Sequence, residues 1–101
     1  MKLRIGEVCE EFIRETGVFV NEDKIRRYES LGLFSSTRDK STDYREFSEA
    51  EQSRVREVLM MLELGIAPQD ILNNNEEKIK DRIKSMAYLL EQLKKSRKEV
   101  V

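Results

Sequence analysis

Hydrophobic residues recur at helical spacing near the N-terminus of the chain. They follow the i, i+3, i+4, i+7, i+8 pattern, which places side chains on one face of an α-helix over residues 5–15. The residues on this face are Ile5, Val8, Cys9, Phe12 and Ile13. Gly17 follows the pattern and predicts the end of the helix, because glycine readily adopts the left-handed conformation found there. The pattern therefore predicts an amphipathic helix that packs against a core.

A second helix is predicted to begin after Asn21 and to run to Leu31. The side chain of Asn21 can accept a hydrogen bond from the first turn of this helix. Glu22 and Asp23 place carboxylates in the same turn, where the helix dipole favours negative charge. We expect Ile25 and Leu31 to face the core, and the glycine after Leu31 to end the helix.

The helical period disappears between residues 33 and 47, whose sequence is LFSSTRDKSTDYREF. Isolated aromatic residues in a polar sequence predict two short strands, around 33–36 and 44–47, joined by a polar loop. Because two strands are unstable on their own, we expect this hairpin to pack against the helices.

Helical periodicity returns at Ser48. Ser48 and Glu51 form the S-x-x-E pattern of a capping box, which predicts the start of a third helix. Gly65 predicts its end, and Pro68 suits the first turn of a short fourth helix. The residues on the apolar face of the third helix are Val55, Val58, Leu59 and Leu62.

A long fifth helix is predicted from residue 75 onward. About 25 residues at ~1.5 Å each give a length of about 37 Å, which exceeds the core of so small a domain. Its apolar residues are spaced by 4, 3, 4 and 3, as in a heptad seam, and one further leucine widens the stripe. We therefore expect an interface with a second copy of the chain, formed by Ile79, Ile83, Met86, Leu89, Leu90 and Leu93.

The charges beside this seam leave an alternative open. Lys80, Arg82 and Lys94 fall at flanking positions, and no acidic residue stands there to pair with them. A simple charge-paired coiled coil therefore describes the helix poorly. The alternative is that the seam packs onto the chain's own domain.

Composition excludes several classes of protein. The 101 residues suit one small domain with an extension, and 39% hydrophobic with 39% charged residues is too polar for a membrane protein and too apolar for a disordered one. No apolar run of roughly 18 residues and no apolar signal segment is present, so we expect a cytoplasmic protein. The net charge of −1, from 19 basic and 20 acidic residues, gives no support for nucleic-acid binding. The local distribution of basic residues must therefore decide that question.

The sequence offers little material for catalysis or metal binding. Its one cysteine, Cys9, lies on the apolar face of the first helix and has no partner for a disulfide, so we expect a core residue. The chain has no histidine, and no Asp-rich loop or Gly-rich phosphate loop is present. We therefore expect neither an enzyme nor a bound cofactor or metal.

Five segments, in order, resemble the MerR family of bacterial transcription regulators. LRIGEV is similar to the opening helix of the family, and TGV to the turn that follows it. IRRYESLGLF resembles the signature I-R-Y-Y-E-x-x-G-L-L, and TDYREFSEAE resembles G-Y-R-x-Y-S-x-x-D. LELGIAPQDIL resembles L-x-x-L-G-F-S-L-x-x-I, so the likeness extends over about residues 3–72.

The resemblance implies a mainly α protein with two parts. Residues 1–74 would form a winged helix-turn-helix DNA-binding domain with a two-stranded β wing, and residues 75–101 a long C-terminal dimerisation helix. The second helix would enter the major groove, and the wing would follow the DNA backbone. The residues expected to contact double-stranded DNA are Asn21, Lys24, Arg26, Arg27, Tyr28, Arg38, Lys40, Tyr44 and Arg45.

The chain departs from the family pattern at several positions. Its first helix is about one turn longer, and the turn before the second helix has two extra residues. Arg27 stands where the family has a tyrosine, and Asp43 stands where the wing has a glycine, which weakens the left-handed option of that loop. The sequence ends after the long helix, so we expect no small-molecule effector domain.

These patterns predict a homodimeric, sequence-specific transcriptional regulator that binds and distorts an inverted-repeat promoter site. The first alternative is a protein-interaction module of MerR-like fold that modulates co-chaperones without binding DNA. The acidic balance and the Glu22–Asp23 pair favour that module, whereas Arg26, Tyr44 and Arg45 favour DNA. The second alternative is an excisionase-like accessory factor that bends DNA. Glu22 and Asp23 could also accept a hydrogen bond from cytosine N4 and so read sequence, or could only support the helix terminus.

Overall fold

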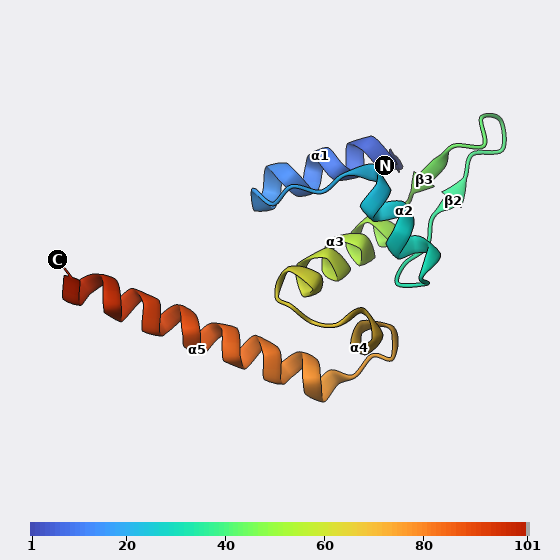
Figure 1. The fold of residues 1–101 in the computed structure, drawn as a ribbon. Helices are drawn as coiled ribbons and strands as arrows, with labels where there is room; N and C mark the ends of the chain where they lie inside the picture. The colour runs from blue at the N-terminus through green and yellow to red at the C-terminus, as the bar shows by residue number, and fades with distance from the viewer. Residues whose placement is uncertain (101) are drawn as a thin grey trace. The chain divides into compact units, whose positions relative to one another are not determined.

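The computed structural model describes residues 1–100, with side chains up to residue 98. The described chain is mainly helical with a small antiparallel sheet, as the sequence predicted (Figure 1). Its elements are β1 (Leu3–Arg4), α1 (Ile5–Thr16), α2 (Glu22–Ser30), β2 (Thr37–Arg38), β3 (Arg45–Phe47), α3 (Glu49–Glu63), α4 (Pro68–Leu72) and α5 (Glu76–Val100).

The chain divides into two compact units, Met1–Leu59 and a second unit that starts at Met60. The first unit holds both of the predicted DNA-binding elements, and the second holds the predicted dimerisation helix. The division predicted at residue 74 stays a prediction, because compactness does not show which part binds what. No helix among the residues described is long and apolar enough to cross a membrane.

Helices α1 and α2 begin where the sequence predicted, and α2 ends at Ser30, one residue before the predicted end at Leu31. Gly17 ends α1 with a φ of 72°, and its N–H donates to the carbonyl oxygen of Ile13 at 2.8 Å. The side-chain oxygen of Asn21 accepts a hydrogen bond from the backbone N–H of Lys24 at 2.8 Å, which caps α2. The burial expected for Leu31 is wrong, since this residue is 53% exposed. It is the residue after the last one of α2, and its N–H donates to the carbonyl oxygen of Arg27 at 3.1 Å.

The sheet has one strand more than the sequence predicted. Its order is β1-β3-β2, and both pairs are antiparallel. The predicted second strand is confirmed as β3, but the strand predicted around 33–36 is wrong. Leu33 and Phe34 are both buried but lie in a segment without strand structure, and β2 begins only at Thr37. The sequence did not predict strand β1, because two residues are too few to show the alternation of hydrophobic and polar side chains that marks a strand.

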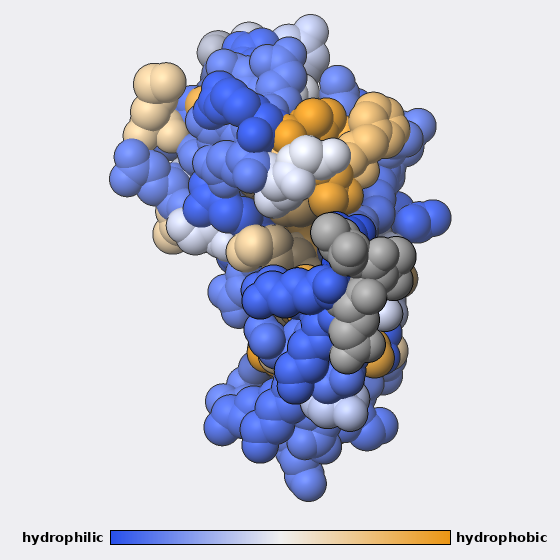
Figure 2. Space-filling model, turned by 90° about the vertical axis from the view of Figure 1, so that its left-hand side faces the viewer, coloured by the Kyte–Doolittle hydropathy of each residue, from blue (hydrophilic) through white to orange (hydrophobic). Residues whose placement is uncertain are grey.

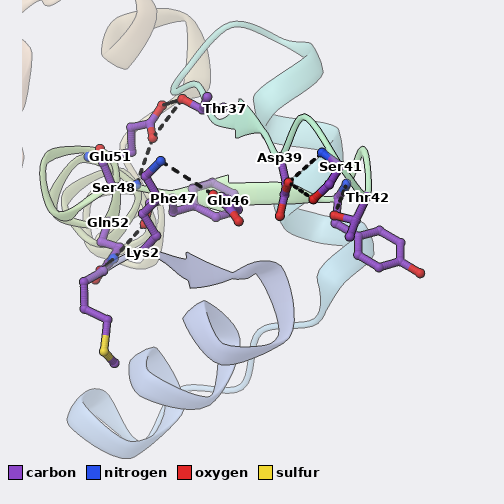
Figure 3. A network of polar contacts seen from close by, with 12 residues as sticks. Lys2, Thr37, Asp39, Ser41, Thr42, Glu46, Phe47, Ser48, Glu51 and Gln52 are labelled. Carbon is purple, nitrogen blue, oxygen red and sulfur yellow. Dashed lines mark hydrogen bonds and ion pairs between the residues drawn. The ribbon is translucent and has the colours of Figure 1, made fainter.

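The loop between β2 and β3 is shaped by its own polar side chains. Asp43 has a φ of 60°, so the left-handed conformation is adopted here without glycine, as aspartate tolerates. The carboxylate of Asp39 accepts hydrogen bonds at 2.8 Å from the backbone N–H and the hydroxyl of Ser41 (Figure 3). These hydrogen bonds lower the pKa of Asp39 to about 2. The loop therefore keeps its shape at neutral pH through a carboxylate that stays ionised.

A second polar network joins the base of the wing to the start of α3. The predicted capping box is confirmed, because Ser48 N–H donates to Glu51 at 2.9 Å and Glu51 N–H donates to the Ser48 hydroxyl at 3.2 Å. The hydroxyl of Thr37 also donates to Glu51, at 3.3 Å (Figure 3). Gln52 donates to the carbonyl oxygen of Phe47 at 2.7 Å. Each wing strand is thus hydrogen-bonded to α3, β2 through Glu51 and β3 through Gln52.

The core of the first unit lies where α1, α2, α3 and the sheet meet. Ile25, Phe47 and Val58 have no exposed surface, and Val55 is 1% exposed. All residues classed as buried in the described chain are hydrophobic. Cys9 belongs to this core, as expected, and burial is the main reason why the pKa of its thiol is raised.

The second unit starts in the last turn of α3. Pro68 occupies the first turn of α4, as predicted, and Ile71 is buried at 2% exposure. Asn75 accepts a hydrogen bond from the N–H of Lys78 at 3.3 Å and caps α5. Arg82, for which the sequence offered no acidic partner, donates instead to the carbonyl oxygen of Leu64 at 2.5 Å.

Most of the heptad seam on α5 is uncovered in the single chain. Ile79 and Met86 are half-buried. Ile83, Leu89, Leu90 and Leu93 are between 48% and 58% exposed. Figure 2 shows a surface that is otherwise mostly hydrophilic, with hydrophobic side chains gathered in separate groups. An apolar stripe of this kind on a charged helix is typical of an interaction surface.

Candidate nucleic-acid interface

The predicted contact Arg26 lies on the exposed side of α2 between two carboxylates. One guanidinium nitrogen is 3.0 Å from Glu22 Oε1, and the other is 3.0 Å from Asp23 Oδ1. All three side chains are on the same helix, at spacings of three and four residues that bring them onto one face. The positive charge of Arg26 is therefore balanced locally by two acids, which weakens its attraction for a phosphate.

The remaining predicted contacts of α2 form two groups on its surface: Arg27 with Tyr28, and Asn21 and Lys24 with Arg27. The guanidinium carbon of Arg27 is 5.0 Å from the centre of the Tyr28 ring, and Nη2 is 3.4 Å from the Tyr28 hydroxyl. Tyr28 is half-buried and Arg27 is exposed. Asn21, Lys24 and Arg27 line one hollow at the start of the helix. Asp23 lines the same hollow, so an acidic side chain stands among these predicted contacts.

Arg45 of β3 is held by helix α2. Its Nε donates to Glu29 Oε1 at 2.6 Å, and the hydroxyl of Ser36 donates to the other carboxylate oxygen. The side chains of Arg45 and Glu29 are only 23% and 17% exposed. This ion pair connects β3 to the last turns of α2. It fixes the wing relative to the helix, a role that the sequence did not indicate.

The same contacts determine the pKa of Glu29. Burial by itself raises the pKa of this carboxyl group, but the hydrogen bonds from Ser36 and Arg45 and the charge of Arg45 outweigh burial and lower it. A group with a lowered pKa in the folded state stabilises the protein above its unfolded pKa, about 4.3 for glutamate. That stabilisation is lost as the pH falls through the lower, folded pKa.

Replacement of Glu29 by glutamine is expected to lower the free energy of unfolding by about 1–3 kcal/mol at pH 7, because Arg45 loses its charged partner. The difference from the unchanged protein should persist between pH 5 and 7 and shrink below about pH 4. Urea denaturation followed by circular dichroism at several pH values measures it. Glu57→Gln is the matched control, since Glu57 is exposed and meets Arg54 only at 3.4 Å. A difference that is independent of pH down to pH 2 would contradict this role of Glu29.

The other wing residues are more accessible. Arg38 is exposed, and its Nη1 donates to the carbonyl oxygen of Asp43 at 2.8 Å. Tyr44 is 59% exposed, and Lys40 is exposed in the loop. The guanidinium of Arg4 lies over the Tyr44 ring, 4.9 Å from its centre. Arg4 was absent from the predicted contacts because its place beside the wing depends on strand β1.

One hollow in the first unit collects several of these side chains. Arg4, Arg26, Arg38 and Arg45 come to it from four different elements, together with Tyr44, Ile5 and Glu22. Of the predicted contacts, the structure therefore brings Arg26, Arg38, Tyr44 and Arg45 together here, and Asn21, Lys24 and Arg27 together at the start of α2. Tyr28 and Lys40 line neither hollow. Within the described residues, no group of three or more acidic or cysteine side chains could hold a metal ion.

Comparison with known proteins identifies the architecture. Residues 3–73 match the model of the MerR HTH family of regulatory proteins. Among solved structures, the chain is similar to HiNmlR, a MerR family regulator lacking the sensor domain, in a crystal structure bound to promoter DNA. The TM-score is 0.68 at 15% sequence identity, and the match covers 91% of this chain and 77% of that one. No curated protein matches the chain. The predicted winged helix-turn-helix with a long C-terminal helix is confirmed.

Proposed function

Because the chain belongs to the MerR family of helix-turn-helix regulatory proteins, we propose that it is a sequence-specific DNA-binding transcriptional regulator. The observation that carries this proposal is the convergence of four arginines from β1, α2, β2 and β3 on one hollow beside the exposed face of α2. A DNA phosphate carries the negative charge that such a site attracts, and phosphate contacts supply most of the affinity of DNA-binding proteins.

In the proposed complex, α2 enters the major groove and the wing lies along the backbone. Arg38, Lys40, Tyr44 and Arg45 contact phosphates from the wing, and Arg26, Arg27 and Tyr28 do so from α2. Asn21 and Lys24 stand at the N-terminal end of α2, the end that reads base edges in this class of motif. Glu22 and Asp23 beside them can accept hydrogen bonds from the N4 amino group of cytosine.

The proposal includes a homodimer formed through α5. Its exposed stripe of Ile79, Ile83, Met86, Leu89, Leu90 and Leu93 would be covered by the same stripe of a second copy. A two-fold dimer presents two recognition helices to an inverted repeat. The Arg45–Glu29 ion pair fixes each wing to its helix. Because the two wings cannot move independently of their helices, the DNA between the two half-sites would bend or untwist to fit the dimer.

The test is binding to a DNA fragment that spans the promoter of the protein's own gene, measured by fluorescence anisotropy from 50 to 200 mM salt. A dimer with 6–10 phosphate contacts should lose roughly 1,000-fold or more in affinity over this range. An unrelated fragment of equal length is the control and should bind at least about 1,000-fold more weakly than the promoter. Absence of binding even at 50 mM salt would contradict the proposed function.

The protein-interaction module remains a second candidate because of one observation. Glu22 and Asp23 neutralise Arg26 on the face that would meet DNA, which leaves this part of α2 without net positive charge. A surface of that kind suits a protein partner as well as a base edge. Absence of DNA binding combined with an intact, folded dimer would favour this second candidate.

A further inference from the structure

The place of Arg4 beside the wing is fixed by its backbone. Arg4 pairs with Glu46 of β3, and its N–H donates to Glu7 Oε1 at 3.0 Å. Its side chain is exposed, with the guanidinium 4.9 Å from the centre of the Tyr44 ring. A guanidinium that stacks on an aromatic face keeps its in-plane N–H groups available for an acceptor. The Tyr44 ring thus favours one orientation of Arg4, in which its in-plane N–H groups can meet an acceptor.

The four arginines of the hollow differ in how their charges are balanced. Arg26 is paired with Glu22 and Asp23, and Arg45 is paired with Glu29. Among the described residues, Arg4 and Arg38 form no ion pair with a carboxylate. Arg38 is oriented by a neutral group, the carbonyl oxygen of Asp43 at 2.8 Å. The arginines of the hollow that form no ion pair are therefore Arg4 and Arg38, and the charge of Arg38 also helps to lower the pKa of Glu29.

We infer that Arg4 and Arg38 together bind one phosphate of the DNA backbone, with the Tyr44 ring positioning Arg4 for this contact. The inference rests on the proposed function and adds to it a contact outside the recognition helix and the wing hairpin. Two planar guanidinium groups present N–H donors in the fork geometry that matches phosphate oxygens. Because both are oriented by neutral partners before DNA arrives, little side-chain entropy is lost when the phosphate binds.

A backbone phosphate fits this place better than a base edge or an acidic peptide. The hollow lies where β1 and the wing strands flank α2, and the wing is the part that follows the DNA backbone in the proposed complex. Contacts to phosphates position a protein without reading sequence, which suits arginines that are held rigidly. An acidic protein partner at the same arginines is the competing occupant and is an outcome of the test below.

The experiment replaces Arg4 by glutamine in the full-length protein and measures binding to the same promoter fragment at several salt concentrations. Each neutralised phosphate contributes about 0.9 to the steepness of log affinity against log salt, so a dimer in which Arg4→Gln is combined with Arg38→Gln should show a slope less steep by about 1.8 and, at 0.1 M salt, an affinity lower by about eightfold per site. Arg4→Gln alone leaves Arg38 at the phosphate and should give a smaller loss of both. The affinity should fall equally for the promoter and for unrelated DNA, because phosphates carry no sequence information.

Arg14→Gln is the matched control. Arg14 is an exposed arginine of α1 that meets only Glu11, at 3.6 Å, and it stands ten residues, about 15 Å of helix, beyond Arg4. Its replacement removes the same charge without touching the hollow and should leave the salt slope unchanged. Circular dichroism and thermal unfolding verify that both variants are folded, and Arg4→Lys, which keeps the charge but not the planar group, should give an intermediate loss.

Two variants of Tyr44 test the positioning role of its ring. Tyr44→Phe keeps the ring under Arg4 and should leave the salt slope unchanged, losing only the contact of its own hydroxyl, whereas Tyr44→Leu should make the slope less steep by as much as Arg4→Gln does. In combination, Tyr44→Leu and Arg4→Gln should change the salt slope no more than either alone, because both remove the same charged contact. Fully additive changes of the slope would overturn the positioning role.

The outcomes separate this inference from the proposed function. If the unchanged protein binds the promoter and the Arg4→Gln variant has the same affinity and salt slope, the inferred phosphate contact is wrong. The proposed function as a DNA-binding regulator is then unaffected. If Arg4→Gln loses affinity for specific DNA only, the contact is to a base and the inference is overturned. If the unchanged protein binds no DNA, both fail, and capture of an acidic peptide through Arg4 would identify the competing occupant.

Discussion

Replacement of Leu90 by aspartate is expected to turn the protein into a monomer and to lower its affinity for promoter DNA by about 100-fold or more. Leu90 lies in the C-terminal half of the exposed stripe of α5 and is 52% exposed in the single chain. In a two-fold dimer, the substitution places a charge from each copy in an apolar interface, where an unpaired charge costs several kcal/mol. A monomer then binds each half-site separately and loses the effective concentration that joins the two binding events.

The matched control for this substitution is Ser85→Asp. Ser85 is exposed on the same helix and lies off the heptad seam, so it adds the same charge outside the predicted interface. Light scattering at tens of micromolar protein measures the mass of each variant, and anisotropy measures DNA binding. The unchanged protein and Ser85→Asp should both be dimers. A dimeric Leu90→Asp variant, or a monomeric unchanged protein, would show that this seam is not the interface.

Replacement of Phe47 by alanine is expected to lower the free energy of unfolding by about 3–5 kcal/mol. Phe47 has no exposed surface, lies on the central strand of the sheet and pairs with Leu3 of β1. Its loss leaves a cavity beneath the wing that rigid neighbours fill only in part. Because a small domain is stable by only about 5–15 kcal/mol, this single change should remove a large share of the total stability.

Phe19→Ala is the control because it is the same chemical change at an exposed position. Phe19 is 73% exposed and should contribute within about 0.5 kcal/mol. Urea denaturation of both variants, followed by circular dichroism, gives the two values directly. Equal losses for Phe19 and Phe47 would contradict the burial of β3 at the centre of the first unit.

The helices of this protein follow from local sequence because the interactions that define them are local. The Asn21 cap acts over three residues, and the Ser48–Glu51 capping box acts over the same distance. The left-handed residue after α1 is likewise adjacent to the helix that it ends. Both partners of each such interaction lie within about one helical turn of each other in the sequence. These elements could therefore be predicted from the sequence.

The strands were harder to predict because they are too short to carry a pattern. Strand β1 has two residues and exists only because β3 lies beside it. The pair Leu33 and Phe34 looked like a strand but is a buried loop segment, since tertiary packing covers both side chains. At Asp43 the sequence predicted a weakened left-handed option because glycine is absent, but aspartate adopts this conformation, and its N–H donates to the carbonyl oxygen of Asp39 at 2.8 Å.

By itself, the sequence determined the order of the helices, their capped ends, the apolar stripe of α5 and the resemblance to a helix-turn-helix regulator. Only the tertiary structure decided which arginines form no ion pair. Arg45 is balanced by Glu29, 16 residues away, and Arg4 reaches Tyr44 through the pairing of β1 with β3. The physical reason is the separation in sequence between the groups that interact. Helix caps and apolar periods depend on neighbours within a few residues, whereas the electrostatics of a site depends on charges that the fold alone brings together.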